Sequence, residues 1–180
     1  MWNYVLEKEV LQTPKNLFGG SMRRVLVVSD SHGNNENVRK AIEKAGRIDI
    51  MIHLGDIGYN YHEIERMAHV PTYMVSGNND YGLPTKDRII IQIGGHKIYA
   101  VHGHRHGVHF GPDTIRYNAL ENECDIAMYG HTHVPFLDEG DVTILNPGSL
   151  TFPRQQGHEK TFLVMEIDDN DEVTYTFDHI

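Results

Sequence analysis

Short apolar runs alternate with amphipathic runs along most of the chain. Residues 25–28 form a continuous apolar run, which is typical of a strand buried on both faces. Asn34 and Asn35 precede a helical pattern, and either side chain can cap it. Helices are predicted at about 36–45, 60–68 and 113–122, and strands at 49–54, 72–75, 88–93, 97–101, 125–129, 142–145, 161–167 and 172–178. This alternation predicts an α/β fold.

The first 21 residues differ in character from the rest and end in a linker-like Phe-Gly-Gly-Ser sequence at 18–21. We predict an N-terminal extension of uncertain structure over residues 1–21, in which a short strand or a disordered arm are both open. A single domain is predicted over residues 22–180, because the chain is too short for two full domains.

Five of the predicted apolar strands end in a polar turn that contains glycine and Asp, Asn or His. These turns lie at 29–33, 55–56, 76–80, 102–104 and 130–133. In open α/β sheets, ligands bind beyond the carboxyl ends of the strands. We therefore expect the five turns to converge at one edge of one sheet.

The turns contain seven side chains that can hold a cation: Asp30, His32, Asp56, Asn78, His102, His131 and His133. In an extended segment Asp30 and His32 point the same way and can reach one ion. The two oxygens of Asp56 can bridge two ions. Oxygen and imidazole ligands without a thiolate favour Mn, Fe, Ni, Co or Zn over Ca or Mg.

Taken singly, most of these turns are typical of ordinary loops. The sequence Gly-His-Thr-His at 130–133 is the strongest piece, because two histidines at i and i+2 after a buried strand have little structural use. The chain has 13 histidines, and their number alone favours neither interpretation. The repeated placement of such residues after strands favours a metal site.

Composition narrows the function classes. The formal net charge of −9 argues against strong nucleic-acid binding, so an anionic substrate must meet local positive charge such as metal ions. No apolar run approaches the ~18 residues of a membrane helix, and we expect no membrane association. A lone cysteine, Cys124, fits a reducing compartment, and a cytoplasmic location is expected.

The ordered motifs resemble those of the calcineurin-like metallophosphoesterases. They are Asp-x-His at 30–32, Gly-Asp at 55–56, Gly-Asn-x-Asp at 77–80, His-Gly-His at 102–104, Gly-His-Thr-His at 130–133 and Asn-Pro-Gly-Ser at 146–149. The chain is most similar to the small bacterial and archaeal phosphodiesterase branch, which also includes the eukaryotic retromer scaffold subunit. The resemblance implies a four-layer α/β/β/α sandwich with a two-metal site at the carboxyl ends of the strands.

The resemblance also implies how the ligands divide. One metal would be held by Asp30, His32, Asp56 and His133, and the other by Asp56, Asn78, His102 and His131, with Asp56 bridging. Both ions would be divalent transition metals, with Mn first and Ni, Fe, Co or Zn as alternatives. A bridging hydroxide would attack the phosphorus of a small phosphodiester. Two such ions, two carboxylates and one hydroxide leave one net positive charge, which a diester monoanion neutralises and a monoester dianion exceeds.

Three further residues are candidates for catalysis. Asn79 stands where many family members have a histidine that assists the leaving group, which puts the expulsion of poor leaving groups in question. His104 is the candidate substitute, and a supporting or solvent-exposed role is equally open. Arg154 is a candidate for contacting the substrate phosphate in bidentate fashion, with an ordinary surface residue as the alternative.

Two other functions compete with the phosphodiesterase. A non-catalytic scaffold would bind protein partners through exposed apolar patches, but all seven ligand positions hold a competent residue. A phosphomonoesterase is disfavoured by Asn79 and by the lack of a cap domain. The sequence leaves the oligomeric state open, and a homo-oligomer is compatible with it.

Overall fold

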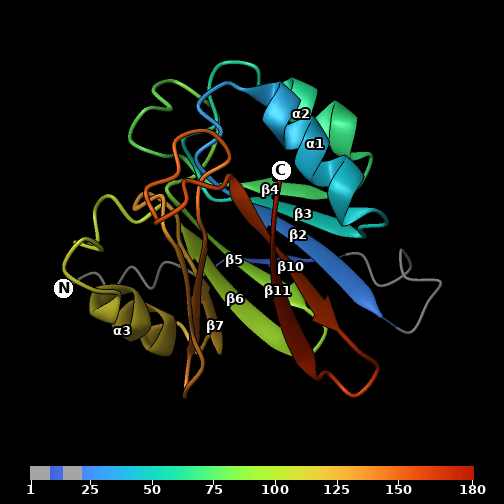
Figure 1. The fold of residues 1–180 in the computed structure, drawn as a ribbon. Helices are drawn as coiled ribbons and strands as arrows, with labels where there is room; N and C mark the ends of the chain where they lie inside the picture. Colours follow the sequence, from blue (N-terminus) through green and yellow to red (C-terminus); the bar gives the residue numbers. More distant parts are fainter. Residues whose placement is uncertain (1–8, 14–21) are drawn as a thin grey trace.

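The computed structural model describes residues 9–13 and 22–180, which form three helices and eleven strands (Figure 1). The helices are α1 (Asn35–Ala45), α2 (Tyr61–Ala68) and α3 (Asp113–Glu121). The strands are β1 (Val10–Gln12), β2 (Arg23–Val28), β3 (Ile50–His53), β4 (Thr72–Met74), β5 (Arg88–Ile93), β6 (His96–Val101), β7 (Ile126–Met128), β8 (Pro135–Asp138), β9 (Thr143–Pro147), β10 (Thr161–Ile167) and β11 (Val173–His179).

The strands form two sheets, one in the order β11-β10-β2-β3-β4 and the other in the order β1-β5-β6-β7-β9-β8. Strands β2, β3 and β4 are parallel to each other, as are β6, β7 and β9. Helices α1 and α2 pack on the first sheet, and α3 packs on the second (Figure 1). This arrangement confirms the predicted α/β/β/α sandwich.

Alternation along the strands builds three apolar cores. In β2, Val25 and Val27 face the second sheet, whereas Leu26 and Val28 face the helices. In β6, Ile98 faces the first sheet in the same way. Burying each large aliphatic side chain contributes about 1.5–3 kcal/mol, so the two sheets are held firmly against each other.

The predicted elements agree with the structure to within one or two residues at most ends. Asn34 caps α1, since its side chain accepts a hydrogen bond from the Asn37 N–H. Strand β8 was not predicted, because it is a partly exposed edge strand that begins with Pro135. Within the predicted extension, residues 10–12 form β1 and pair with β5. Residues 1–8 and 14–21 of that extension lie outside the described residues.

The polar turns do not share one sheet edge, so that prediction is wrong. Three of them follow β2, β3 and β4 of the first sheet, and two follow β6 and β7 of the second. The two edges nevertheless meet, because the His131 N–H donates to Asp30 Oδ2 at 3.1 Å and His102 Nδ1 donates to the Leu54 carbonyl at 2.7 Å. The interface between two sheets therefore brings the turns together.

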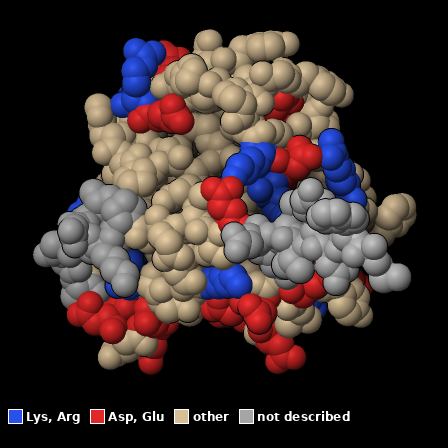
Figure 2. Space-filling view, turned by 180° about the vertical axis from the view of Figure 1, so that it is seen from behind, with Lys and Arg blue, Asp and Glu red and all other residues tan. Residues whose placement is uncertain are grey.

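Charge is unevenly spread on the face opposite to that of Figure 1. Figure 2 shows Asp and Glu side chains gathered along the lower rim, while Lys and Arg stand in separate groups. The formal net charge is −9.

None of the three helices in the described residues, 9–13 and 22–180, has the length and apolar character needed to span a membrane.

Candidate metal centre

Five of the seven predicted ligands have left-handed backbone conformations. The φ angles are +54° at Asp30, +46° at His32, +52° at Asp56, +66° at His131 and +62° at His133. Such a conformation costs a non-glycine residue of order 1–3 kcal/mol and persists only where the surroundings enforce it. The prediction that Asp30 and His32 lie in an extended segment is therefore wrong, although both side chains still reach the same place.

Hydrogen bonds between the loops hold these conformations. The Asp30 N–H donates to the Gly55 carbonyl at 3.0 Å, and the His32 N–H donates to the Asp56 carbonyl at 2.8 Å. Gly77 packs so closely against the next loop that an added Cβ would lie 2.1 Å from Asp56 Oδ1. The chain thus needs glycine at this position to bring the β4 loop against Asp56.

Four of the predicted ligands form a compact cluster. One ligand atom from each of Asp30, His32, Asp56 and His133 lies within 4.8 Å of the others. His133 Nε2 is 2.9 Å from Asp30 Oδ1, and His32 Nε2 is 3.6 Å from Asp56 Oδ2. These separations allow one cation to contact all four side chains.

A second group adjoins the first through Asp56. His102 Nε2 lies 3.6 Å from Asp56 Oδ2 and 3.9 Å from Asp30 Oδ1. The His131 ring stands 5.1 Å from the His102 ring, centroid to centroid. Asn78 lies in the β4 loop, one residue before Asn79, which binds Asp56 directly. Asp56 therefore belongs to the first cluster and also lies beside His102 of the second predicted set.

Two histidines are oriented by backbone carbonyls. His102 Nδ1 donates to the Leu54 carbonyl, and His133 Nδ1 donates to the Phe152 carbonyl, each at 2.7 Å. Because a carbonyl only accepts, each ring is protonated at Nδ1 when neutral, and its Nε2 lone pair faces the cluster. The His32 and His133 Nε2 atoms face each other at 3.5 Å.

Two polar atoms of the ligand group, Asn78 Oδ1 and His102 Nε2, are buried without a hydrogen bond. Asp30 Oδ1 is buried with the His133 imidazole nitrogen 2.9 Å away. Leaving a buried polar atom unpaired costs about 1–3 kcal/mol, and more for a charged group. A carboxylate oxygen, an amide oxygen and an imidazole nitrogen are all metal ligands. The donor set therefore fits the divalent transition metals that the sequence predicts.

The electrostatics of the cluster keep the carboxylate charged and one imidazole neutral. Burial opposes the charge of Asp30, but His133, His102 and Ser29 outweigh it and hold the pKa of Asp30 below its usual value. Burial, together with His102 and His109, lowers the pKa of His131 to about 4. Burial also opposes the charge of His133, yet Asp30 raises the pKa of that imidazole overall.

The three candidates for catalysis surround the cluster. Asn79 donates from its side chain to Asp56 Oδ2 at 2.7 Å and from its backbone to Asp56 Oδ1 at 2.9 Å. The His104 ring lies 5.5 Å from that of His102, and its Nδ1 is buried without a partner. Arg154 is exposed, and its backbone N–H donates to the His133 carbonyl at 3.0 Å.

His53, which was not predicted from the sequence, is a fully buried residue that supports two ligand loops. Its Nδ1 accepts from the Gly55 N–H at 3.3 Å, so its Nε2 donates to Ser31 Oγ at 2.9 Å. Burial lowers the pKa of His53 to about 4, which keeps the ring neutral. A histidine inside an apolar strand, at the last position before the turn, was the available signal.

The Asp80 carboxylate and the Asn-Pro-Gly-Ser motif also brace the loops. Asp80 accepts from the Ile57, Gly58 and Gly77 N–H groups, at distances of 2.8–3.1 Å. Ser149 Oγ donates to the Asp30 carbonyl at 3.0 Å. Asn146 donates to the Gly130 carbonyl at 2.8 Å. These bonds connect the motif residues to the backbone of the ligand loops.

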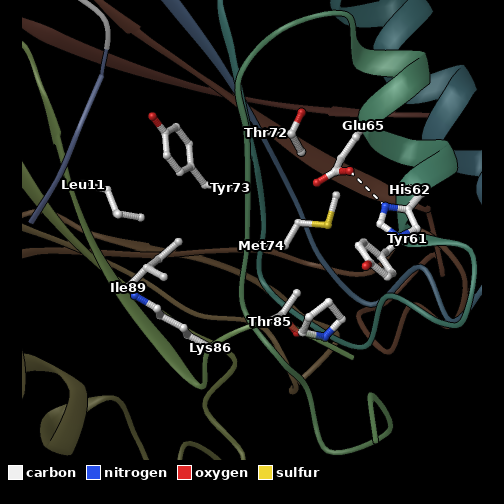
Figure 3. A pocket seen from close by; sticks show the side chains of 11 residues that line it. Leu11, Tyr61, His62, Glu65, Thr72, Tyr73, Met74, Thr85, Lys86 and Ile89 are labelled. Atoms are coloured by element: carbon white, nitrogen blue, oxygen red, sulfur yellow. Dashed lines mark hydrogen bonds and ion pairs between the residues drawn. The ribbon is translucent and has the colours of Figure 1, made fainter. Parts of the chain in front are cut away.

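The cavity of about 380 Å³ shown in Figure 3 is separate from this cluster. Leu11, Tyr73, Met74 and Ile89 line it, and none of the predicted ligands does. His62, which also lines it, pairs with Glu65 at 3.3 Å. The predicted metal centre at the strand ends therefore does not include this cavity.

The chain matches the model of the calcineurin-like phosphoesterase superfamily domain over residues 22–170. It therefore belongs to this superfamily. A probable metallophosphoesterase of Bacillus subtilis is 33% identical over 156 residues, covering 85% of this chain and 89% of the relative. A phosphodiesterase of Methanocaldococcus jannaschii is 28% identical over 145 residues, covering 69% of this chain and 82% of the relative.

Solved structures share the fold. A predicted phosphoesterase of Streptococcus pneumoniae TIGR4 has a TM-score of 0.72 at 27% identity, and the match covers 89% of this chain and 99% of the S. pneumoniae chain. Vps29 of Entamoeba histolytica, complexed with zinc, has a TM-score of 0.68 at 22% identity and covers 87% of this chain and 98% of its own. At that identity the likeness to Vps29 establishes the fold alone.

Proposed function

We propose that this protein is a two-metal phosphodiesterase that acts on small phosphodiesters. The observation that carries the proposal is that Asn78 Oδ1 and His102 Nε2 are buried without a hydrogen bond beside the compact four-residue ligand cluster. A protein without a metal here would leave these atoms desolvated and unpaired, at a cost in stability. The phosphodiesterase relative supports the choice of reaction.

The two proposed cation positions share Asp56. One would use Asp30, His32, Asp56 and His133, and the other Asp56, Asn78, His102 and His131. When bound, two divalent cations supply a hydroxide nucleophile at neutral pH and offset the charge that develops on the phosphoryl oxygens. Mn is our first choice, with Ni, Fe, Co and Zn as alternatives, and we place the protein in the cytoplasm.

The protein's own groups have distinct tasks in this proposal. Asn79 donates two hydrogen bonds to Asp56 and so fixes the orientation of the shared carboxylate. Arg154 is exposed beside His133, where its planar guanidinium can bind two oxygens of a phosphate. Each of these residues acts by positioning or binding.

Proton donation to the leaving group is assigned to His104. An amide has no readily lost proton at neutral pH, and the side chain of Asn79 is already engaged with Asp56. His104 offers an imidazole next to His102. General acid catalysis contributes about 10²–10⁴-fold, which sets the scale of its effect on esters whose alkoxide leaves poorly.

A graded series of leaving groups tests the role of His104. His104→Ala should reduce turnover of alkyl diesters far more than that of nitrophenyl diesters, because nitrophenolate leaves without a proton. Equal losses across the series would instead assign His104 to phosphate binding or to support of the metal ligands. A series that is flat in both proteins would show that no proton donor is needed.

The function itself is tested by a screen of the purified protein with Mn, Ni, Mg and Zn. We expect hydrolysis of bis(p-nitrophenyl) phosphate to depend on a transition metal and to exceed that of p-nitrophenyl phosphate. Asp56→Asn is the matched control. A preference for the monoester would replace the proposal with a phosphomonoesterase, and no turnover with any metal would favour a scaffold.

A further inference from the structure

A cavity of about 440 Å³ adjoins the proposed metal centre on the side of the β4 loop. Its walls come from the segment between β4 and β5 and from residues that follow β6. Its volume falls in the range of about 300–1,000 Å³ that is usual for small-molecule sites. Asn78 and His104 both line it, so one wall of the cavity belongs to the proposed catalytic site.

Two residues of the inner wall each carry a polar atom without a hydrogen bond. Asn78 Oδ1 and His104 Nδ1 are both buried and lack a hydrogen-bond partner within the described residues. Asp80 also lines the cavity, but its carboxylate is taken up by three backbone N–H groups. A group in the cavity therefore lies next to the residues that we propose as metal ligand and proton donor.

The outer wall combines an aromatic ring with an ion pair. Tyr81 follows Asp80 and is 85% exposed, which leaves a large flat ring open to solvent. Arg105 Nη1 lies 2.6 Å from Asp87 Oδ2, and both residues line the cavity. Because Asp87 neutralises Arg105, the described residues that line the cavity offer no unpaired cation of the kind that a second phosphate or a polynucleotide backbone would need.

We propose that this cavity binds the nucleoside part of a mononucleoside phosphodiester, with the base stacked on Tyr81. The inference rests on the proposed function, because the metal centre would hold the phosphate. Bases stack on aromatic side chains irrespective of their identity, since every base has a flat π-face. A plain alkyl substituent would leave the ring of Tyr81 unused.

Two substrates with the same leaving group isolate the contribution of the base. These are the p-nitrophenyl ester of thymidine 5′-phosphate and ethyl p-nitrophenyl phosphate, assayed on the metal-loaded protein. Tyr81→Ala should lower kcat/KM for the thymidine substrate about 5- to 100-fold, mostly through KM, and leave the ethyl substrate unchanged. Tyr81→Phe should retain the wild-type value, because stacking needs only the ring.

Tyr117→Ala is the matched control, since Tyr117 is an exposed aromatic residue on α3 that does not line the cavity. It should change neither substrate. Equal losses on both substrates in Tyr81→Ala would overturn the proposal, because Tyr81 would then serve the nitrophenyl group or the loop. Unchanged values on both substrates would overturn it as well.

A binding measurement separates this inference from the proposed function. Thymidine 5′-phosphate, titrated calorimetrically into the metal-loaded wild type, should bind more tightly than methyl phosphate, and Tyr81→Ala should remove the difference. If no diester is hydrolysed but this preference is found, the phosphodiesterase proposal fails and the cavity assignment stands. Equal affinity for the two ligands would contradict the cavity assignment alone.

Discussion

The two ends of the sandwich both bring histidine and aspartate together, but with opposite results. At the end opposite the metal centre, His96 Nδ1 bonds to Asp125 Oδ2, and His96 Nε2 donates to the Asp171 carbonyl at 2.7 Å. Asp125 also accepts from the Lys97 N–H at 2.7 Å, and Asp171 from the Gly95 N–H at 2.9 Å. Every partner in that cluster is supplied by the protein.

At the carboxyl ends of the strands, some polar atoms of the same residue types have no hydrogen-bond partner. His102 Nε2 is buried without a hydrogen bond, and Asp30 Oδ1 is buried with only the His133 imidazole, at 2.9 Å, against it. Composition therefore does not distinguish the two clusters. What separates them is burial and pairing: the His96 cluster is partly exposed and its polar atoms are paired, whereas the strand-end cluster is buried and keeps ligand atoms without a hydrogen bond, which suits it to hold cations.

The largest effect is expected for Asp56→Asn, which changes the residue shared by the two proposed ion positions. The change removes the shared ligand and its charge, so we expect loss of bound metal and a fall in diester turnover of about 10³-fold. Asn78→Ala should leave one ion bound and reduce turnover less. Metal analysis and steady-state kinetics of both variants check this, and near-normal turnover with full metal in Asp56→Asn would exclude the shared role.

Gly77→Ala should damage the centre without replacing any ligand residue. The new methyl group would stand 2.1 Å from Asp56 Oδ1 and 2.2 Å from the Asp56 backbone N, so the two loops must separate. We expect a loss of about 1–3 kcal/mol in the free energy of unfolding, together with weaker metal binding. Gly140→Ala is the matched control, because its nearest neighbour, Arg116 Nη1, would be 3.6 Å away. Chemical denaturation that ranks the two variants equally would refute the close-packing argument.

His53→Gln should have a moderate effect on metal affinity. His53 orients Ser31 and the turn at Gly55, and partners that support ligands typically contribute 10–100-fold in metal affinity. We expect a rise in the metal Kd of about that size, greater in His53→Ala, because glutamine can keep a bond to Ser31. The exposed His62→Gln is the control. A lower Tm with an unchanged metal Kd would reduce His53 to a packing role.

The smallest effect is expected at the opposite end. Burial opposes the charge of His96, but Asp125 and the Asp171 carbonyl outweigh it and raise the pKa of His96 above its usual 6.5. A raised pKa stabilises the fold at low pH, and the contribution is lost as pH rises through the raised value. Wild type should therefore exceed His96→Gln in Tm by about 2–4 °C at pH 6 and by less at pH 8.5. Metal content and turnover should be unchanged, and a difference that grows with pH would contradict this sign.

The sequence allowed much of this picture to be predicted, for identifiable reasons. The strands with strong apolar runs, such as β2 and β10, were found because both their faces are buried. The partly exposed β8 lacked that signal. The turns were found because their polar residues follow strands, but their left-handed backbones were not, since hydrogen bonds between distant loops impose them.

Which sheet each turn belongs to is also decided by pairing between strands that are distant in the sequence. Local pattern shows where each strand ends but not which strands pair, so all five turns were expected on one sheet. His53 was missed for a related reason, because its contact with Ser31 joins two turns that are 22 residues apart in the chain.

The central claim is that the unsatisfied strand-end cluster holds two transition-metal ions. Its most direct test is elemental analysis of the wild-type protein after loading with Mn and removal of loosely bound metal. We predict close to two ions per chain, with fewer in Asp56→Asn and an unchanged count in His96→Gln. A count near zero in the wild type, with no activity gained on adding Mn or Ni, would contradict the account.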